Sequence, residues 1–222
     1  MKLPSTLYRY RSLAGDGFKY TQDIFLRKRL YLPVYSTLND PAEGFFRNPG
    51  KLEYKDGGWY AAHNPLQRLS ENVRVLCFTE DCLNPLMWAH YADSHRGICI
   101  GFRTAAFQRV RPIQYPSRVP DLDPALPPDE KRTKAFFTKR AAWAYEREWR
   151  VVETEETDFL PLKDGDITQV IFGERTSRAD REWVFEWLRS SQSKAVMKRI
   201  VVTGVHARLH AVMYSEVDDR EI

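Results

Sequence analysis

Short runs of alternating apolar and polar residues, or of mostly β-branched and aromatic residues, recur along this chain of 222 residues. Successive side chains of a β-strand point to opposite faces, so a repeat of two residues predicts a strand in each run. The first run, LYRYR at residues 7–11, is rich in aromatic residues. Further strands are predicted at residues 30–32, 73–78, 97–102, 148–153, 167–172, 199–205 and 211–217.

Helices are predicted where capping residues meet a helical repeat. Residues 21–29 predict a helix with Thr21 as its N-cap, and Asn84–Pro85 opens a second helix that continues to residue 93. Ser177 and Asp180 resemble a capping box. The helix after that box carries one apolar face, made of Trp183, Val184, Trp187 and Leu188. Weaker helical patterns cover residues 64–72 and 129–140.

The order of these elements indicates the fold class. Strands and helices follow one another without a strict β–α alternation, which is typical of an α+β fold. We expect mixed, mainly antiparallel sheets around a central cleft, with helices at the periphery. No linker, repeat or low-complexity tract is visible, so a single domain over residues 1–222 is expected. The proline-rich residues 112–128 predict a long loop that suits a lid.

Composition narrows the class of protein. The apolar fraction of 43% supports a core, yet no run approaches the ~20 apolar residues that span a membrane. The first residues lack the apolar stretch of a secretory signal, and three cysteines cannot all pair. We therefore expect a cytoplasmic protein without membrane partners. Residues 103–150 hold 11 basic and 6 acidic residues, a balance that attracts a nucleotide or nucleic acid if these side chains share a face.

Polar side chains are densest at residues 77–102 and 143–150, where they stand among large apolar residues. Such groups are costly to bury unless they are paired or used. Cys77, Cys82, His90 and His95 at first suggest a zinc site. Their inner spacing is short for structural zinc, and two histidines five residues apart do not share a helix face, so no metal site is predicted.

Two groups remain as candidates for chemistry. Alternation along a strand places Glu146, Glu148 and Arg150 on one face if the strand begins by Glu146, and the arginine would hold the carboxylates ionised. A surface charge ladder is the alternative. The helix after Pro85 aims His90 or Tyr91 at a cleft, and a buried histidine with a satisfied hydrogen bond is the alternative there.

Several motifs together resemble an uncharacterised prokaryotic family, domain of unknown function number 2971. The resemblance extends in order over most of the chain, although the family name implies no activity. The matching pieces are YRYR at 8–11, LNDP at 38–41 with Glu43, CFTE at 77–80, PLMWAHY at 85–91, GxCxGF at 97–102 and WxYExExR at 143–150.

A more distant resemblance is to the ADP-ribosyltransferase superfamily, whose arginine-class members carry an early arginine, a Ser/Thr on a later strand and a late ExE motif. The resemblance implies that NAD is the substrate and that Glu148 stabilises an oxocarbenium-like transition state. It also implies that Glu146 orients the acceptor and that Tyr91 takes part in the site. The residues implied to bind NAD are Arg9, Arg11, Thr79, Trp88 and His90.

The function expected on these grounds is an NAD-dependent transferase of a bacterial toxin or defence system. Its ligand would be a nucleotide-type small molecule, and its acceptor a protein or nucleic acid. Two alternatives stay open. One is a non-catalytic ligand-sensing or protein-interaction domain built on the same aromatic cleft. The other is a nuclease-like or RNA-modifying enzyme, which requires several carboxylates to converge on a divalent ion.

Overall fold

A computed structural model describes residues 2–40, 43, 52–55, 58–61, 73–118, 123, 125–154, 157–203 and 208–214. Contacts between residues divide the chain into two compact units. Unit 1 comprises Met1–Tyr31, Cys77–Gln108 and Phe159–Ile222, and unit 2 comprises Leu32–Leu76 and Arg109–Asp158. Strand β5 (Arg74–Thr79) has residues in both units. The expectation of a single domain stays a prediction.

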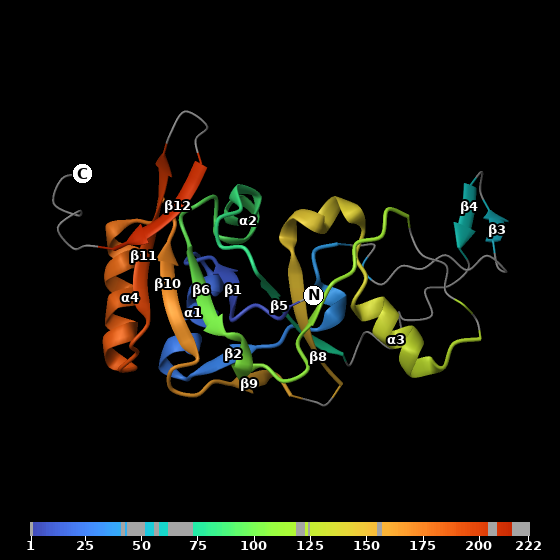
Figure 1. Cartoon of the computed structure of the whole chain (residues 1–222), viewed down its shortest axis with the longest axis horizontal. Helices are drawn as coiled ribbons and strands as arrows, with labels where there is room; N and C mark the ends of the chain where they lie inside the picture. Colours follow the sequence, from blue (N-terminus) through green and yellow to red (C-terminus); the bar gives the residue numbers. More distant parts are fainter. Residues whose placement is uncertain are drawn as a thin grey trace. The chain divides into compact units, whose positions relative to one another are not determined.

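The α+β class is confirmed, because helices accompany a large sheet that is mixed and mostly antiparallel (Figure 1). In unit 1 its strand order is β12-β11-β10-β6-β1-β5. The bounds are β1 Thr6–Arg11, β6 Ile98–Arg103, β10 Ile167–Phe172, β11 Val196–Thr203 and β12 Arg208–Met213. Only the pair β10 and β11 is parallel among the pairings described for these strands. The expected central cleft stays a prediction.

The register of β1 places two arginines on one face of the sheet. Tyr10 pairs with Cys99 and Arg11 with Ile98 across the antiparallel neighbour β6. Residues at i and i+2 share a face, so Arg9 and Arg11 point the same way. The chain enters β6 through Gly97, where a Cβ would lie 2.1 Å from the carbonyl oxygen of Arg11. A side chain is therefore excluded where these two strands meet.

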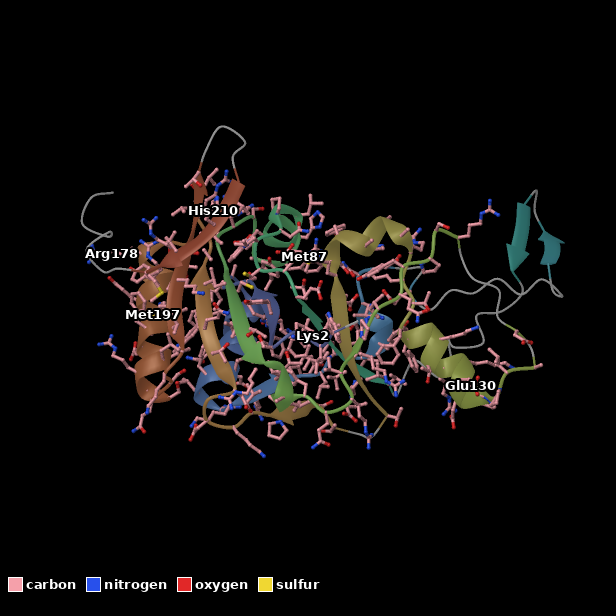
Figure 2. The ribbon with its side chains drawn as sticks, viewed as in Figure 1. Lys2, Met87, Glu130, Arg178, Met197 and His210 are labelled. Atoms are coloured by element: carbon pink, nitrogen blue, oxygen red, sulfur yellow. The ribbon has the colours of Figure 1, made fainter. Side chains whose placement is uncertain are left out.

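Three helices belong to unit 1: α1 (Asp16–Leu26), α2 (Pro85–Tyr91) and α4 (Arg178–Ser190). Helix α2 begins at Pro85 as predicted and is capped by the Asn84 side chain, and Ser177 caps α4 in the predicted capping box. Val184, Trp187 and Leu188 of α4 are buried, whereas Trp183 of the predicted apolar face is 48% exposed. Met87 lies on the buried side of α2 (Figure 2). The remaining elements of unit 1 are β2 (Arg29–Tyr31), paired with β9 (Phe159–Pro161), and the 3-10 turn η2 (Thr104–Ala106).

Unit 2 is built around β8 (Glu148–Glu153), whose Arg150 pairs with Arg111 of β7 (Arg111–Pro112). Its other elements are η1 (Tyr35–Thr37), β3 (Leu52–Lys55), β4 (Gly58–Ala61), α3 (Pro128–Phe136) and η3 (Ala141–Glu146). The core of the unit contains Val75, Phe136, Trp149 and Val151. Trp149 and Val151 alternate with Glu148 and Arg150 along β8, so the apolar and the charged side chains lie on opposite faces of the strand.

Three element predictions need correction. The first helix begins at Asp16 instead of Thr21, and the Thr21 hydroxyl donates to the Gly17 carbonyl inside the helix at 2.7 Å. The helix expected at 129–140 ends at Phe136. The condition that the strand begin by Glu146 is not met, because Glu146 lies in η3 and β8 begins at Glu148. Arg147 separates that strand from η3 with a left-handed φ of 43°. The weak helix at 64–72 lies outside the described residues.

Within the described residues, no helix has the length and apolar character that crossing a bilayer requires.

Candidate functional site

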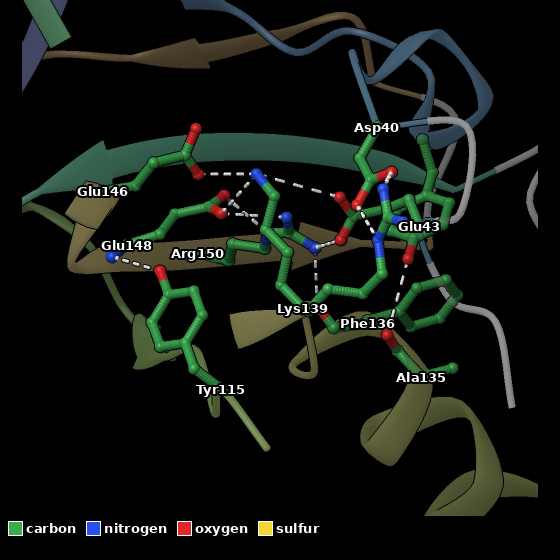
Figure 3. Close-up of polar contacts among 11 residues, drawn as sticks. Asp40, Glu43, Tyr115, Ala135, Phe136, Lys139, Glu146, Glu148 and Arg150 are labelled. Carbon is green, nitrogen blue, oxygen red and sulfur yellow. Dashed lines mark hydrogen bonds and ion pairs between the residues drawn. The ribbon is translucent and has the colours of Figure 1, made fainter. Parts of the chain in front are cut away.

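The predicted ExE motif belongs to a buried charge cluster in unit 2 (Figure 3). Arg150, at the centre of β8, donates from Nε to Glu148 Oε1 at 2.6 Å and from Nη2 to Glu148 Oε2 at 3.0 Å. The two residues are two positions apart on one strand and so share a face. A two-point contact between guanidinium and carboxylate is short, charge-assisted and directional. It fixes the side chain of Glu148.

Lys139 connects the two glutamates of the motif. Its ammonium lies 2.6 Å from Glu146 Oε2 and 3.3 Å from Glu148 Oε2. Lys139 also lies over the Trp143 ring, with 4.7 Å between Nζ and the ring centroid. Glu146 and Glu148 therefore meet at one cation, although they lie on different elements. The left-handed Arg147 between them redirects the chain and allows this convergence.

Glu43 is the third carboxylate of the cluster. Its Oε1 lies 2.6 Å from Arg150 Nη1, and its Oε2 lies 3.9 Å from Lys139 Nζ. Arg150 Nη1 also donates to the Phe136 carbonyl at 2.9 Å. Each ionic side chain of the cluster is at most 5% exposed. The protein therefore holds five ionic groups away from water here.

The cluster has three carboxylates against two cations, a formal charge of −1 within the described residues. Burial raises the pKa of Glu43, and the nearby Arg150 and Lys139 only partly oppose that rise. Burial also acts to lower the pKa of Lys139, but Glu148, Glu146 and Glu43 outweigh it and the pKa is raised. Burial therefore favours the protonated form of Glu43, and the nearby carboxylates favour the charged form of Lys139.

Two tyrosines and a second ion pair surround the cluster. The backbone N–H of Glu148 donates to the Tyr115 hydroxyl at 2.8 Å. Tyr35 lies beside Arg150 and donates to the Ala135 carbonyl at 3.4 Å, and burial raises its pKa above the ordinary value. Asp40, which is 2% exposed, accepts from Arg140 Nη2 at 2.7 Å. These contacts fix the backbone on both sides of the charged groups.

Unit 1 contains a different arrangement of buried charge. Arg9 is half-buried as a residue, but its Nη1 is fully enclosed and bonds to no residue that the structure describes. Arg11 donates from Nε to the Thr21 hydroxyl at 3.2 Å. Burial and the neighbouring Arg9 lower the pKa of Arg11 to about 9. Burial also lowers the pKa of Arg9. These shifts reflect the cost of burying two cations together.

The other predicted site residues also lie in unit 1. Trp88 is fully buried, donates from Nε1 to the Cys82 carbonyl at 2.9 Å and packs edge-on against Tyr10. The Thr79 hydroxyl is buried and accepts from the Asp81 backbone N–H. His90 is exposed and its ring lies 6.1 Å from that of Tyr91. Binding or catalytic roles for these residues stay predictions.

The predicted site residues thus divide between the units. Glu146 and Glu148 belong to unit 2 and meet there. Arg9, Arg11, Thr79, Trp88, His90 and Tyr91 belong to unit 1. One cleft shared by both groups stays a prediction.

Sequence reasoning missed two members of the charge cluster, Glu43 and Lys139, and the neighbouring Tyr115. Glu43 appeared only within a family motif, next to an Asn-Asp-Pro turn. Lys139 is one basic residue among many in its stretch, and Tyr115 lies in the expected loop. No local signal separates these residues from surface positions, because their partners are distant in sequence.

Among the described residues, no group of three histidine, cysteine, aspartate or glutamate side chains is arranged to hold a metal ion.

The chain was compared with models of protein families. The model of a family described as a protein of unknown function (DUF2971) matches residues 87–120. The expected resemblance over most of the chain is therefore corrected to this segment, which contains Trp88, His90 and Tyr91. Neither the curated proteins nor the solved structures contain a match to the chain.

Proposed function

We propose that this protein binds a phosphate-bearing nucleotide through Arg9 and Arg11 of unit 1. The observation that carries the proposal is that two half-buried arginines share one face of β1, one of them with an enclosed Nη1, while no described carboxylate forms an ion pair with either. Removing a cation from water without a partner is unfavourable by several kcal/mol. An anionic ligand between the two side chains offsets that loss.

The chemistry of the arginines favours phosphate. A guanidinium presents a planar fork of donors that matches two phosphate oxygens. Arg11 uses only its Nε toward Thr21, and its two Nη groups bond to no described residue. Arg9 adds a second positive charge close to that fork. The pair therefore suits a diphosphate or another doubly charged phosphate better than a single carboxylate.

Aromatic side chains close to Arg11 extend the ligand class from phosphate to nucleotide. Tyr20 of α1 lies near Arg11 and is 41% exposed. Its ring stacks on Tyr31, with 4.9 Å between centroids and 24° between planes. Tyr31 in turn contacts Phe159. Exposed aromatic rings are the usual surfaces on which bases stack, and such stacking contributes ~1–3 kcal/mol per base.

The activity proposed with this ligand is transfer of ADP-ribose from NAD, by resemblance to ADP-ribosyltransferases. It is supported by the contacts of Glu148, which Arg150 and Lys139 hold in place beside two positive charges. A carboxylate can stabilise the positive charge that develops on the ribose as nicotinamide leaves. In this proposal Glu146 orients the acceptor.

Binding is tested first, by calorimetry on the full chain with NAD, ADP-ribose, AMP and pyrophosphate. We expect ADP-ribose and NAD to bind more tightly than AMP, and Arg11→Met to weaken them by about 10- to 100-fold, the loss of one charge-assisted contact. Arg178→Met is the matched control, because Arg178 is 72% exposed and paired only with Glu182 in α4. Equal affinity in Arg11→Met and the wild type would contradict the proposal.

Cleavage is tested separately with NAD and a cell extract as the source of acceptor. Loss of an electrostatic stabiliser predicts a fall of about 10²–10³ in rate for Glu148→Gln. Glu43→Gln serves as a control for disturbance of the same charge cluster. Binding of NAD without cleavage by the wild type would favour the non-catalytic ligand-sensing alternative. Equal rates for Glu148→Gln and the wild type would exclude Glu148 from the mechanism.

A further inference from the structure

A pocket of about 450 Å³ lies in unit 1, apart from the residues used in the proposed function. Three segments form it: the end of α1 with Lys28, the chain from Leu162 to Ile167 before and into β10, and the turn from Ser191 to Lys194 after α4. Sites for small organic ligands have volumes of roughly 300–1,000 Å³. The pocket therefore has the size of a ligand site.

The floor of the pocket is apolar. Phe25 is fully buried and Leu162 is 7% exposed, and both line the cavity. The Phe25 ring packs on Trp187 of α4 with 5.9 Å between centroids and 28° between planes. An aromatic ring held by core packing is a fixed surface. It suits the flat or apolar body of a ligand.

The rim of the pocket is basic. Lys28, Lys163 and Lys194 line it together with Asp164, which pairs with Lys28. Among the described residues, Lys163 and Lys194 form no ion pair. The C-terminal ends of α1 and α4 reach the same pocket, and each helix end contributes about −0.5 charge. Three lysines, one aspartate and two helix ends therefore leave roughly one positive charge, enough for one anionic group.

The backbone around the pocket is left-handed at three places. Lys28 has a φ of 47° and Gln192 a φ of 54°, while Gly165 has a φ of 82°. Lys28 and Gln192 follow the ends of α1 and α4, where glycine is the usual residue. A left-handed backbone is strained for a non-glycine residue, and such strain concentrates at functional sites. Because residue 28 is lysine, a charged side chain stands at the rim of the pocket, which glycine would not supply.

We propose that this pocket binds a small organic phosphate with an apolar ring. The ring would lie on Phe25 and Leu162, and the phosphate would contact Lys163 and Lys194. The proposal is independent of the nucleotide site, because it uses none of the residues proposed to bind there.

The test uses 1-naphthyl phosphate, with 1-naphthol and inorganic phosphate as the matching uncharged and ringless probes. We expect 1-naphthyl phosphate to bind the wild type at least ~10-fold more tightly than either, since one ionic contact of ~1.4 kcal/mol gives that factor. Changing both Lys163→Met and Lys194→Met should weaken its binding at least ~10-fold, and arginine at both positions should restore it. Lys19→Met is the control, because Lys19 of α1 is 80% exposed and does not line the pocket.

Both variant lysines are exposed, so the variants should unfold at the wild-type temperature, and thermal unfolding checks this. Unchanged binding in the lysine double variant would overturn the proposal and locate the probe elsewhere, for instance at Arg9 and Arg11. Equal affinities for 1-naphthyl phosphate and inorganic phosphate would also overturn it, because the apolar floor would then contribute nothing.

Discussion

Arginines that are wholly or partly buried occur in both units of this protein, but their surroundings differ. In unit 2, Arg150 is completely buried and contacts the carboxylates of Glu148 and Glu43. In unit 1, Arg9 and Arg11 are half-buried and share one face of β1, and no described carboxylate pairs with them. Both strands therefore carry guanidinium groups into the interior, and only unit 2 supplies the opposite charge from within the chain.

The difference shows how a buried charge can be assigned to structure or to ligand binding. A cation whose donors are satisfied by its own chain, as in unit 2, contributes to the fold whether or not a ligand exists. A cation without such partners lowers stability until an anion binds. The nucleotide proposal therefore rests on unit 1, although the carboxylate motif that first drew interest lies in unit 2.

The largest expected effect on the free energy of unfolding comes from replacing Arg150, the arginine that forms ion pairs. Arg150→Met removes the partner of Glu148 and Glu43 and leaves both carboxylates buried, which should lower the free energy of unfolding by about 3–5 kcal/mol. Urea denaturation of the full chain measures it. Arg178→Met on the exposed side of α4 is the control and should change it by less than about 0.5 kcal/mol. A loss as small as the control's would mean that the cluster is not a stabilising part of unit 2.

Replacing Arg9, which has no ion-pair partner among the described residues, should change the free energy of unfolding in the opposite direction. Arg9→Met replaces a buried unpaired cation with an apolar chain of similar length, and the free energy of unfolding should rise by about 1 kcal/mol or stay unchanged. The same variant should lose much of the stabilisation that ADP-ribose gives the wild type, which is ~2.7 kcal/mol at 100 times Kd. Denaturation with and without ADP-ribose separates the two effects. Destabilisation as large as that of Arg150→Met would remove the contrast between the units.

A smaller effect is expected for the tyrosine that supports the cluster. Tyr115→Phe removes the acceptor of the Glu148 backbone N–H and should lower the free energy of unfolding by about 1 kcal/mol. Thermal or urea unfolding measures this loss. Tyr20→Phe is the control, because its ring is 41% exposed and phenylalanine keeps the stacking surface. An unchanged stability for Tyr115→Phe would indicate that water or another residue replaces the hydroxyl.

The smallest expected effect is a change in how the free energy of unfolding depends on pH. Burial raises the pKa of Glu43, so the folded chain holds its proton at pH values where the unfolded carboxyl, near 4.3, has lost it. Between that pH and the folded pKa, the folded state binds more protons and the free energy of unfolding falls as pH rises. Glu43→Gln cannot titrate and should lack this fall.

Urea denaturation of wild type and Glu43→Gln at a series of pH values from 4 upward measures the slope. Glu182→Gln is the control, because Glu182 is 62% exposed. Parallel curves for Glu43→Gln and the wild type would show that the surplus charge of the cluster lies on another group.

Much of the fold could be predicted from the sequence, because its signals are local. Strands β8 and β10 have the predicted bounds, helix α2 begins at Pro85 as predicted, and Ser177 caps α4 in the predicted capping box. Thr21 was misassigned as a cap because the hydroxyl of a threonine can equally bond inside a helix. The residues of the ExE motif were found, but not the two that complete their network, Lys139 and Glu43.

The sequence by itself determined that arginines occupy alternate positions on β1 and that Glu148 and Arg150 share a face of β8. Those facts follow from the two-residue repeat of a strand, which needs no knowledge of the rest of the chain. Only the tertiary structure decided that Arg150 meets Glu43, while Arg9 and Arg11 meet no described carboxylate. Whether a buried charge is paired depends on which distant segments pack against it, and Coulomb attraction acts through space and not along the sequence.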